Sequence, residues 1–271
     1  MKYRAAAIQM TSAINITDNL ASAKKWIKKA ADEGANFVVL PEMFAVMGMD
    51  QMDKVKAREE WGHGPIQDFL REAALENKVW LVGGTIPIAD PVGPEKVHAT
   101  CILINDEGHV AARYDKIHLF DVIVPSTKEV HQESKVVTHG KEVVVAQTPF
   151  GKVGLAVCYD VRFPEMFRAM QNQNVELVVL PSAFTSPTGK AHWDILVRAR
   201  AIENQVYMIA AAQGGTHESG RKTFGHSMIV DPWGTVLASL PEGEGVVVAD
   251  IDTEYLTQVR EKFPALSHRK I

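Results

Sequence analysis

The sequence predicts an α/β protein in which mixed sheets are layered with helices. Helical and strand patterns alternate along the whole 271-residue chain, and strand patterns outnumber helical ones. Two pairs of strand patterns are joined by tight turns, at 106–108 and at 149–152. Hairpins add antiparallel pairs to a sheet, so a layered sandwich fits better than a singly wound parallel sheet. No linker rich in Gly, Ser or Pro interrupts the chain, so we expect a single domain over residues 1–271.

The first half of the chain opens with a strand pattern at 4–10, made of small and β-compatible residues. A helix follows, because Thr17 and Asp18 are good capping residues, apolar residues then recur at helical spacing, and Gly34 supplies a stop. The other elements expected in this half are a strand at 36–40, a helix at 66–76, a strand at 79–85 and a hairpin at 98–115.

The second half repeats this alternation. The 149–152 turn leads into a strand at 153–157, and Pro164 suits the first position of the helix that follows. The expected strands are 153–157, 176–180, 206–212, 226–230, 235–239 and 245–250, and the expected helices are 164–171, 191–204 and 253–262.

Composition and charge exclude several classes of function. The chain is 46% hydrophobic and 23% charged, as in ordinary globular proteins, and its net charge of -4 gives no reason to expect nucleic acid as a partner. Its longest apolar runs are too short to cross a membrane, and the first residues do not form a signal peptide. With only two cysteines, the chain is no disulfide framework, and we expect a reducing, cytoplasmic setting.

Cys158 is the first candidate for chemistry. It follows the strand pattern at 153–157 and precedes the helix that begins at Pro164. A cysteine between a strand and a helix lies near the helix N-terminus, whose partial positive charge favours a thiolate nucleophile. The alternative is an inert buried cysteine, which is the role that we expect for Cys101.

Two further polar residues directly follow strand patterns. Glu42 comes after the pattern that ends at Leu40, and Lys116 comes after the second strand of the 98–115 hairpin. Catalytic groups of open α/β folds gather where strands end, so these residues are candidates to accompany the cysteine. A thiolate also needs a base, and a cysteine–histidine pair that uses His118 or His192 stays open as an alternative.

Together, the contexts of Glu42, Lys116 and Cys158 resemble the nitrilase, or carbon-nitrogen hydrolase, superfamily over almost the whole chain. The stretches that match around these residues are 40–44, 114–121 and 158–165, and further matches lie at 182–184, 191–205 and 225–234. The three residues correspond in order to the Glu-Lys-Cys triad of that family. The resemblance implies a four-layer α-β-β-α sandwich with two mixed sheets, which pairs with a second subunit to form a homodimer.

The resemblance also implies the chemistry, which is hydrolysis of a small non-peptide amide through a cysteine thioester. Glu42 would take the proton of Cys158, while Lys116 and the backbone N–H of Tyr159 would hold the oxyanion. Glu133 best matches a second glutamate of the family, which would position Lys116 or the substrate. This chemistry needs no metal and no organic cofactor, and the sequence contains no zinc, nucleotide or dinucleotide motif.

Finer matches bear on the substrate. The stretches 162–165 and 225–235 look most like the branch of the family that hydrolyses the ketoamide of deaminated glutathione to 2-oxoglutarate and Cys-Gly. The stretch 132–135 is similar instead to ω-amidases, which act on α-ketoglutaramate and succinamate-type monoamides. A loop at 122–130, which borders the pocket in this family, matches neither branch closely.

Three residues are expected to bind or surround the substrate. Both substrate types carry a carboxylate, and Arg162 is a suitable bidentate partner for it. The alternative is that Arg162 only pairs with Asp160 or Glu165. Phe184 and Thr185 follow the strand at 176–180 and are expected to form walls of the pocket.

Two other observations leave alternatives open. The helix at 192–205 carries apolar residues on several sides, which fits either deep burial or a subunit interface. The stretch at 225–229 begins like a serine-hydrolase elbow but lacks the closing glycine, so we expect Ser227 to be structural. A catalytically idle scaffold that binds a partner or a small amide also stays possible, although the intact triad argues against it.

Overall fold

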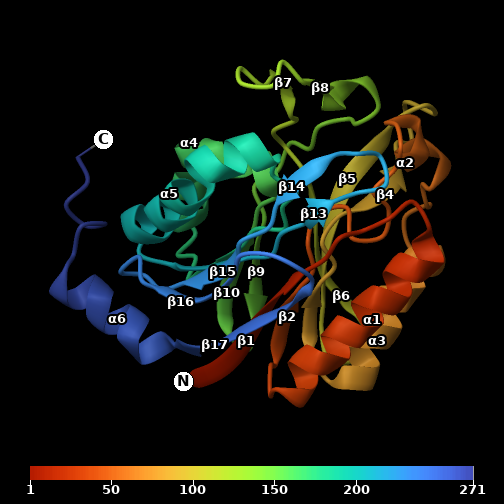
Figure 1. The fold of residues 1–271 in the computed structure, drawn as a ribbon. Helices are drawn as coiled ribbons and strands as arrows, with labels where there is room; N and C mark the ends of the chain where they lie inside the picture. Colours follow the sequence, from red (N-terminus) through yellow and green to blue (C-terminus); the bar gives the residue numbers. More distant parts are fainter. Residues whose placement is uncertain (271) are drawn as a thin grey trace.

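Two mixed sheets lie face to face in the computed structural model, which describes residues 1–270 (Figure 1). The first sheet has the strand order β17-β1-β2-β3-β5-β4, with β6 beside β5. Its strands are β1 (Lys2–Gln9), β2 (Phe37–Val39), β3 (Trp80–Val82), β4 (Ile86–Ala89), β5 (Val97–Ile104), β6 (Val110–Asp115) and β17 (Gly245–Asp252). The pairs β1–β2 and β2–β3 are parallel and the others are antiparallel, which confirms a mixed sheet.

The second sheet has the order β16-β15-β12-β11-β10-β9. Its strands are β9 (Val145–Thr148), β10 (Gly151–Leu155), β11 (Leu177–Val179), β12 (Tyr207–Ala210), β15 (Ser227–Val230) and β16 (Val236–Leu240). Here β10, β11 and β12 run parallel, and antiparallel strands flank them. Both predicted hairpins are present, as β5–β6 and β9–β10.

Alternation of side chains along the strands builds the layers. Phe37 on β2 packs with residues of the second sheet, while its neighbour Val38 packs with the helices on the opposite side. Those helices are α1 (Ile16–Asp32) and α3 (Pro65–Asn77), and α4 (Pro164–Gln171) and α5 (Ser186–Asn204) cover the other sheet (Figure 1). The four layers of the predicted sandwich are therefore confirmed. None of the helices within residues 1–270 is long and apolar enough to cross a lipid bilayer.

Two helix starts differ from the sequence prediction. Helix α1 is capped by Asn15, whose side chain accepts hydrogen bonds from the N–H groups of Thr17 and Asp18, so the cap lies earlier in the chain than predicted. Helix α5 begins at Ser186 rather than near 191. Pro187 is tolerated there because the first turn needs no N–H donor, and Gly189 is small enough to let Phe224 pack against the helix.

Several short elements carried no sequence signal strong enough to be predicted. Strand β4 contains Pro87 and is an edge strand, where the missing N–H is tolerated. The other unpredicted elements are α2 (Met52–Lys56), the hairpin of β7 (Asp121–Ile123) and β8 (Val130–Gln132), the hairpin of β13 (Gly214–Thr216) and β14 (Lys222–Phe224), and 3-10 turns at Glu133–Lys135 and Cys158–Arg162. The final helix, α6 (Thr253–Lys262), was predicted with its correct bounds.

Candidate active site

A cavity of about 410 Å³ opens among the short elements, and this volume suits a small-molecule ligand. It lies where β2 and β6 end, and these strands point the same way because β6 is antiparallel to β5, which is antiparallel to β3. All eight residues predicted for the site line this cavity: Glu42, Lys116, Glu133, Cys158, Tyr159, Arg162, Phe184 and Thr185. Residues spread over more than half of the chain therefore meet in one place.

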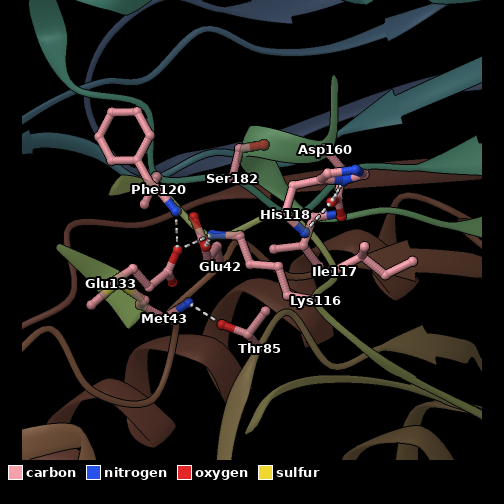
Figure 2. A network of polar contacts seen from close by, with 12 residues as sticks. Glu42, Met43, Thr85, Lys116, Ile117, His118, Phe120, Glu133, Asp160 and Ser182 are labelled. Carbon is pink, nitrogen blue, oxygen red and sulfur yellow. Dashed lines mark hydrogen bonds and ion pairs between the residues drawn. The ribbon is translucent and has the colours of Figure 1, made fainter. Parts of the chain in front are cut away.

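Lys116 is the centre of a buried ionic cluster. Its Nζ donates to Glu42 Oε1 and to Glu133 Oε2, each over 2.8 Å, and the lysine side chain is only 1% exposed (Figure 2). Glu133 Oε2 also accepts a hydrogen bond of 2.8 Å from the backbone N–H of Phe120. Two carboxylates thus fix the position of one ammonium group, and the predicted contact between Glu133 and Lys116 is present.

The backbone around Glu42 is held from two sides. Met43 adopts a left-handed conformation with φ of 59°, and its N–H donates to Thr85 Oγ1 over 2.9 Å (Figure 2). The Gln213 side chain donates to the carbonyl oxygen of Glu42 over 3.1 Å. These contacts turn the chain sharply after β2 and direct the Glu42 side chain toward Lys116.

Cys158 begins a short 3-10 turn, and its own φ is 49°, in the left-handed region that few residues other than glycine adopt. Its N–H donates to the carbonyl oxygen of Pro181 over 2.9 Å. Such a conformation persists only where the surroundings enforce it, and such residues concentrate at functional sites.

Asp160 supplies much of that enforcement, although it was considered from the sequence only as a partner of Arg162. Its fully buried carboxylate accepts hydrogen bonds from the Val157 N–H over 2.8 Å and from the Tyr114 hydroxyl over 2.6 Å. The backbone N–H of His118 donates to it over 3.1 Å, and the His118 ring lies at 2.7 Å through Nδ1 (Figure 2). This carboxylate ties the turn that carries Cys158 to the segment that follows Lys116.

The electrostatics of Cys158 differ from the sequence argument. Burial raises the pKa of the thiol, and the nearby carboxylate of Glu42 raises it further, whereas Lys116 lowers it. The predicted preference for a thiolate near a helix N-terminus is therefore wrong for the resting site, because burial and Glu42 outweigh it. Burial and the Glu42 side chain therefore favour the thiol form of Cys158 in the resting site.

The ionic cluster has a defined charge state. Burial alone would lower the pKa of Lys116, but the charges of Glu133 and Glu42 outweigh it and raise the pKa well above the ordinary value. Burial would raise the pKa of Glu133, but Lys116 and then Lys54 lower it. The lysine is therefore an ammonium and Glu133 a carboxylate at neutral pH.

The two histidines considered as alternative bases lie elsewhere. His118 stacks on Phe163 with ring centroids 3.7 Å apart and contacts Asp160, and His192 Nδ1 lies 3.2 Å from Arg162. Neither belongs to the residues that line the cavity within 1–270. Ser227 is fully buried, and its hydroxyl accepts from the Ala212 N–H over 2.9 Å, as expected of a structural residue.

Arg162 lies beside the cavity with its guanidinium 5.7 Å from the Tyr159 ring and 5.2 Å from the Phe184 ring. Within residues 1–270, the single polar side-chain contact of Arg162 is to His192, so it forms no ion pair with Asp160 or Glu165. The Asp160 carboxylate instead accepts the hydrogen bonds described above. Burial lowers the pKa of the guanidinium from its ordinary value, but arginine stays charged at neutral pH. A free cationic group is therefore present where a substrate carboxylate was expected.

Sequence reasoning missed two cationic residues of the cavity, Lys54 and Arg221. Lys54 lies on α2, with its Nζ 4.0 Å from Glu133 Oε1, and burial lowers its pKa. Arg221 directly precedes β14. Neither residue follows a predicted strand or lies within a matching motif, so only the positions of the short elements bring them to the cavity.

Fold and site together define a hydrolase of carbon–nitrogen bonds, with a buried acid-lysine cluster beside a cysteine in a four-layer sandwich. The sequence profile described as Carbon-nitrogen hydrolase matches residues 4–261, so the chain belongs to the carbon-nitrogen hydrolase family. The family inferred from the three motifs is confirmed.

Individual relatives and solved structures are similar to this chain over nearly its full length. The chain is 43% identical over 271 residues to a protein of Synechocystis named deaminated glutathione amidase, and the match covers 98% of each chain. It is 41% identical over 270 residues to a Dictyostelium discoideum protein of the same name, with 97% of this chain and 92% of that one covered. Among solved structures, Saccharomyces cerevisiae Nit3, a member of branch 10 of the nitrilase superfamily, matches with a TM-score of 0.89 and 32% identity, over 100% of this chain and 97% of that chain.

Proposed function

We propose that this protein hydrolyses the amide bond of deaminated glutathione and releases 2-oxoglutarate and Cys-Gly. The observation that carries the reaction is the buried cluster in which Lys116 contacts both Glu42 and Glu133 beside Cys158. The names of relatives that match over nearly the full chain support the substrate. The free guanidinium of Arg162 supports a substrate that carries a carboxylate.

In the first half of the proposed reaction, Glu42 accepts the proton of the Cys158 thiol as the sulfur attacks the amide carbon. Lys116 and the backbone N–H of Tyr159 stabilise the oxyanion that develops on the carbonyl oxygen. Glu42 then returns its proton to the leaving nitrogen, the carbon–nitrogen bond breaks, and Cys-Gly departs as an amine. The acyl group stays on Cys158 as a thioester.

In the second half, Glu42 takes a proton from a water molecule, which attacks the thioester carbon. The same two donors stabilise the second oxyanion, the carbon–sulfur bond breaks, and the sulfur recovers a proton as 2-oxoglutarate leaves. Glu133 is a positioning residue in this scheme, because it contacts Lys116 and is held in turn by the Phe120 N–H. The scheme uses neither metal nor organic cofactor.

The proposal includes the assembly and setting of the chain. Trp193 and Val197 of α5 are buried, whereas Ile195 and Ile202 are 67% and 48% exposed, so this helix has both a core face and an apolar outer face. Trp233, which is 56% exposed, adds to the apolar outer surface. We assign this face to a homodimer interface. Two free cysteines, Cys101 and Cys158, are consistent with a cytoplasmic setting.

Release of 2-oxoglutarate tests the function, because deaminated glutathione and α-ketoglutaramate both yield it. The two substrates are compared at equal enzyme concentration, with the Cys158→Ala variant as the blank. We expect a kcat/KM at least tenfold higher for deaminated glutathione. The reverse preference would identify an ω-amidase with the same mechanism.

The same assay separates the other two alternatives. Release from neither substrate above the Cys158→Ala blank would favour other amides or a binding scaffold. A cysteine–histidine amidase would lose its activity in His118→Ala or His192→Ala and keep it in Glu42→Gln, whereas the proposed mechanism requires Glu42.

A further inference from the structure

The cavity is lined by four cationic side chains and by four carboxylates, Glu42, Asp50, Glu129 and Glu133, and the proposed reaction does not use all of the cations. Besides Lys116, it is lined by Lys54, Arg162 and Arg221. Arg221 donates through Nη2 to the carbonyl oxygen of Ala183 over 2.9 Å, and its Nη1 lies 4.0 Å from the sulfur of Met43. Within the described part of the chain, neither arginine of the cavity has a carboxylate partner, so two guanidinium groups are available to anions.

Two side-chain nitrogens of residues that line this cavity are buried and lack a hydrogen-bond partner among residues 1–270. They are Nε of Arg221 and Nε2 of His131, and both residues line the cavity. The carboxylate of Glu129 lies 3.6 Å from His131 Nε2, beyond hydrogen-bond distance. A buried polar nitrogen without a partner costs free energy, so two of them beside one cavity point to a site that a ligand completes.

Arg221 and His131 come from two different hairpins, and both residues line the cavity. His131 lies on β8, and Arg221 lies between the exposed Gly220 and β14 (Figure 1). Gly220 and the exposed Glu129 line the cavity as well, which places this pair at its mouth. Arg162 lies closer to the reacting sulfur, because it belongs to the same short turn as Cys158, which is only 7% exposed.

We propose that Arg221 and His131 form a second carboxylate site, which binds the terminal carboxylate of the leaving Cys-Gly portion of the substrate. The inference rests on the proposed function. The acyl portion must stay next to Cys158 as the thioester, so its carboxylate belongs with Arg162. The leaving portion must depart into solvent, so it lies toward the mouth, where Arg221 and His131 line the cavity.

This site gives a physical basis for choosing between the two substrate types. Deaminated glutathione carries a carboxylate on each side of the scissile amide, whereas α-ketoglutaramate carries only the one on the acyl side. A cavity built to bind a polar group discriminates against a substrate that lacks it, because the donors of the site are then left without a partner. Arg221 is therefore a specificity-determining residue for the larger substrate.

The test compares deaminated glutathione with its analogue in which the terminal carboxylate is a carboxamide. Release of 2-oxoglutarate gives kcat/KM for both compounds and for α-ketoglutaramate, with wild type, Arg221→Gln and Arg221→Lys. Lys222→Gln is the matched control, because it removes a positive charge from the next residue, which is exposed and outside the cavity lining. Circular dichroism checks that each variant is folded.

We expect wild type to prefer the carboxylate over the carboxamide by about tenfold or more, mainly through KM, since a hydrogen bond to a charged group is worth about this factor. The preference should fall to within twofold in Arg221→Gln, be partly kept in Arg221→Lys and be unchanged in Lys222→Gln. Hydrolysis of α-ketoglutaramate should change less than threefold in all variants.

Equal rates of wild type on the carboxylate and the carboxamide would overturn the inference, and this result needs no variant. An equal loss of activity on all three substrates in Arg221→Gln would overturn it too, because it would show a structural role. In both cases hydrolysis of deaminated glutathione by wild type would still support the proposed function. Absence of that hydrolysis would instead overturn the proposed function and the inference with it.

Discussion

Replacing Glu133 by glutamine tests whether the buried cluster works by positioning Lys116. The substitution keeps the size of the side chain and an oxygen that accepts hydrogen bonds, but it removes the negative charge. Glu133 Oε2 accepts from Lys116 Nζ and from the Phe120 N–H, each over 2.8 Å. Since charged hydrogen bonds contribute about 1.5–3 kcal/mol and neutral ones about 0.5–1.5 kcal/mol, we estimate a loss of about 1–3 kcal/mol.

This loss should appear in turnover, because the position of Lys116 matters most when the oxyanion forms. A factor of ten in rate corresponds to about 1.4 kcal/mol, so kcat should fall by about fivefold to about 140-fold while KM changes little. The assay is steady-state release of 2-oxoglutarate over a range of substrate concentrations. Glu142→Gln is the control, because Glu142 is an exposed carboxylate outside the cavity lining.

Glu133→Gln also tests how the free energy of unfolding depends on pH. Lys116 and Lys54 lower the pKa of Glu133 from the ordinary value of 4.5, so its charge stabilises the fold above about pH 4.5. That contribution disappears as the pH falls through the lowered pKa. The difference in unfolding free energy between wild type and Glu133→Gln, measured with urea, should therefore be largest at neutral pH and shrink as the pH falls from about 4.5 to about 2.

Two results would refute this reasoning about Glu133. The first is a kcat of Glu133→Gln within twofold of wild type, which would show that the charge does not act on the reaction. The second is a similar loss in Glu142→Gln, which would show that any removed carboxylate has the same effect.

Three further substitutions follow from the structure. Lys116→Ala should lower turnover at least a hundredfold, since one oxyanion donor contributes about 2.7–4 kcal/mol, and turnover within tenfold of wild type in a folded variant would contradict its role. Glu42→Gln should also lower turnover at least a hundredfold. In the same variant, the pH profile of the rate of Cys158 alkylation by iodoacetamide should shift to lower pH, because the carboxylate that raises the thiol pKa is gone. An unshifted pH profile would contradict this prediction. Ile195→Glu should convert a dimer to a monomer in light scattering, and an unchanged mass would exclude this face as the interface.

The sequence by itself determined the fold class and eight of the residues that line the cavity. Strand and helix periodicities are local properties, and β6, β10 and α4 lie close to their predicted positions for that reason. Glu42, Lys116 and Cys158 could be found because each follows a strand pattern in a recognisable motif. Residues at strand ends can meet at one edge of a sheet, so their positions in the sequence already pointed to a shared site.

Tertiary structure alone decided the charge state and the surroundings of these residues. The sequence suggested that a helix N-terminus would favour a thiolate at Cys158, but burial and the carboxylate of Glu42 raise the thiol pKa, and both effects depend on packing. Asp160 lies in the cysteine motif, yet its role depends on Tyr114 and His118, which are distant in the chain.

Arg221 is the clearest example of a residue that only the tertiary structure brings to the site. It directly precedes a three-residue strand, β14, which is too short to give a periodic signal, and it contacts Ala183 and Met43 from other parts of the chain. Local propensity cannot encode such contacts, because they are formed only when distant segments pack together. Periodicity and motifs therefore identified the candidate residues around Cys158. Packing decided their pKa values and brought the additional cationic residues to the cavity.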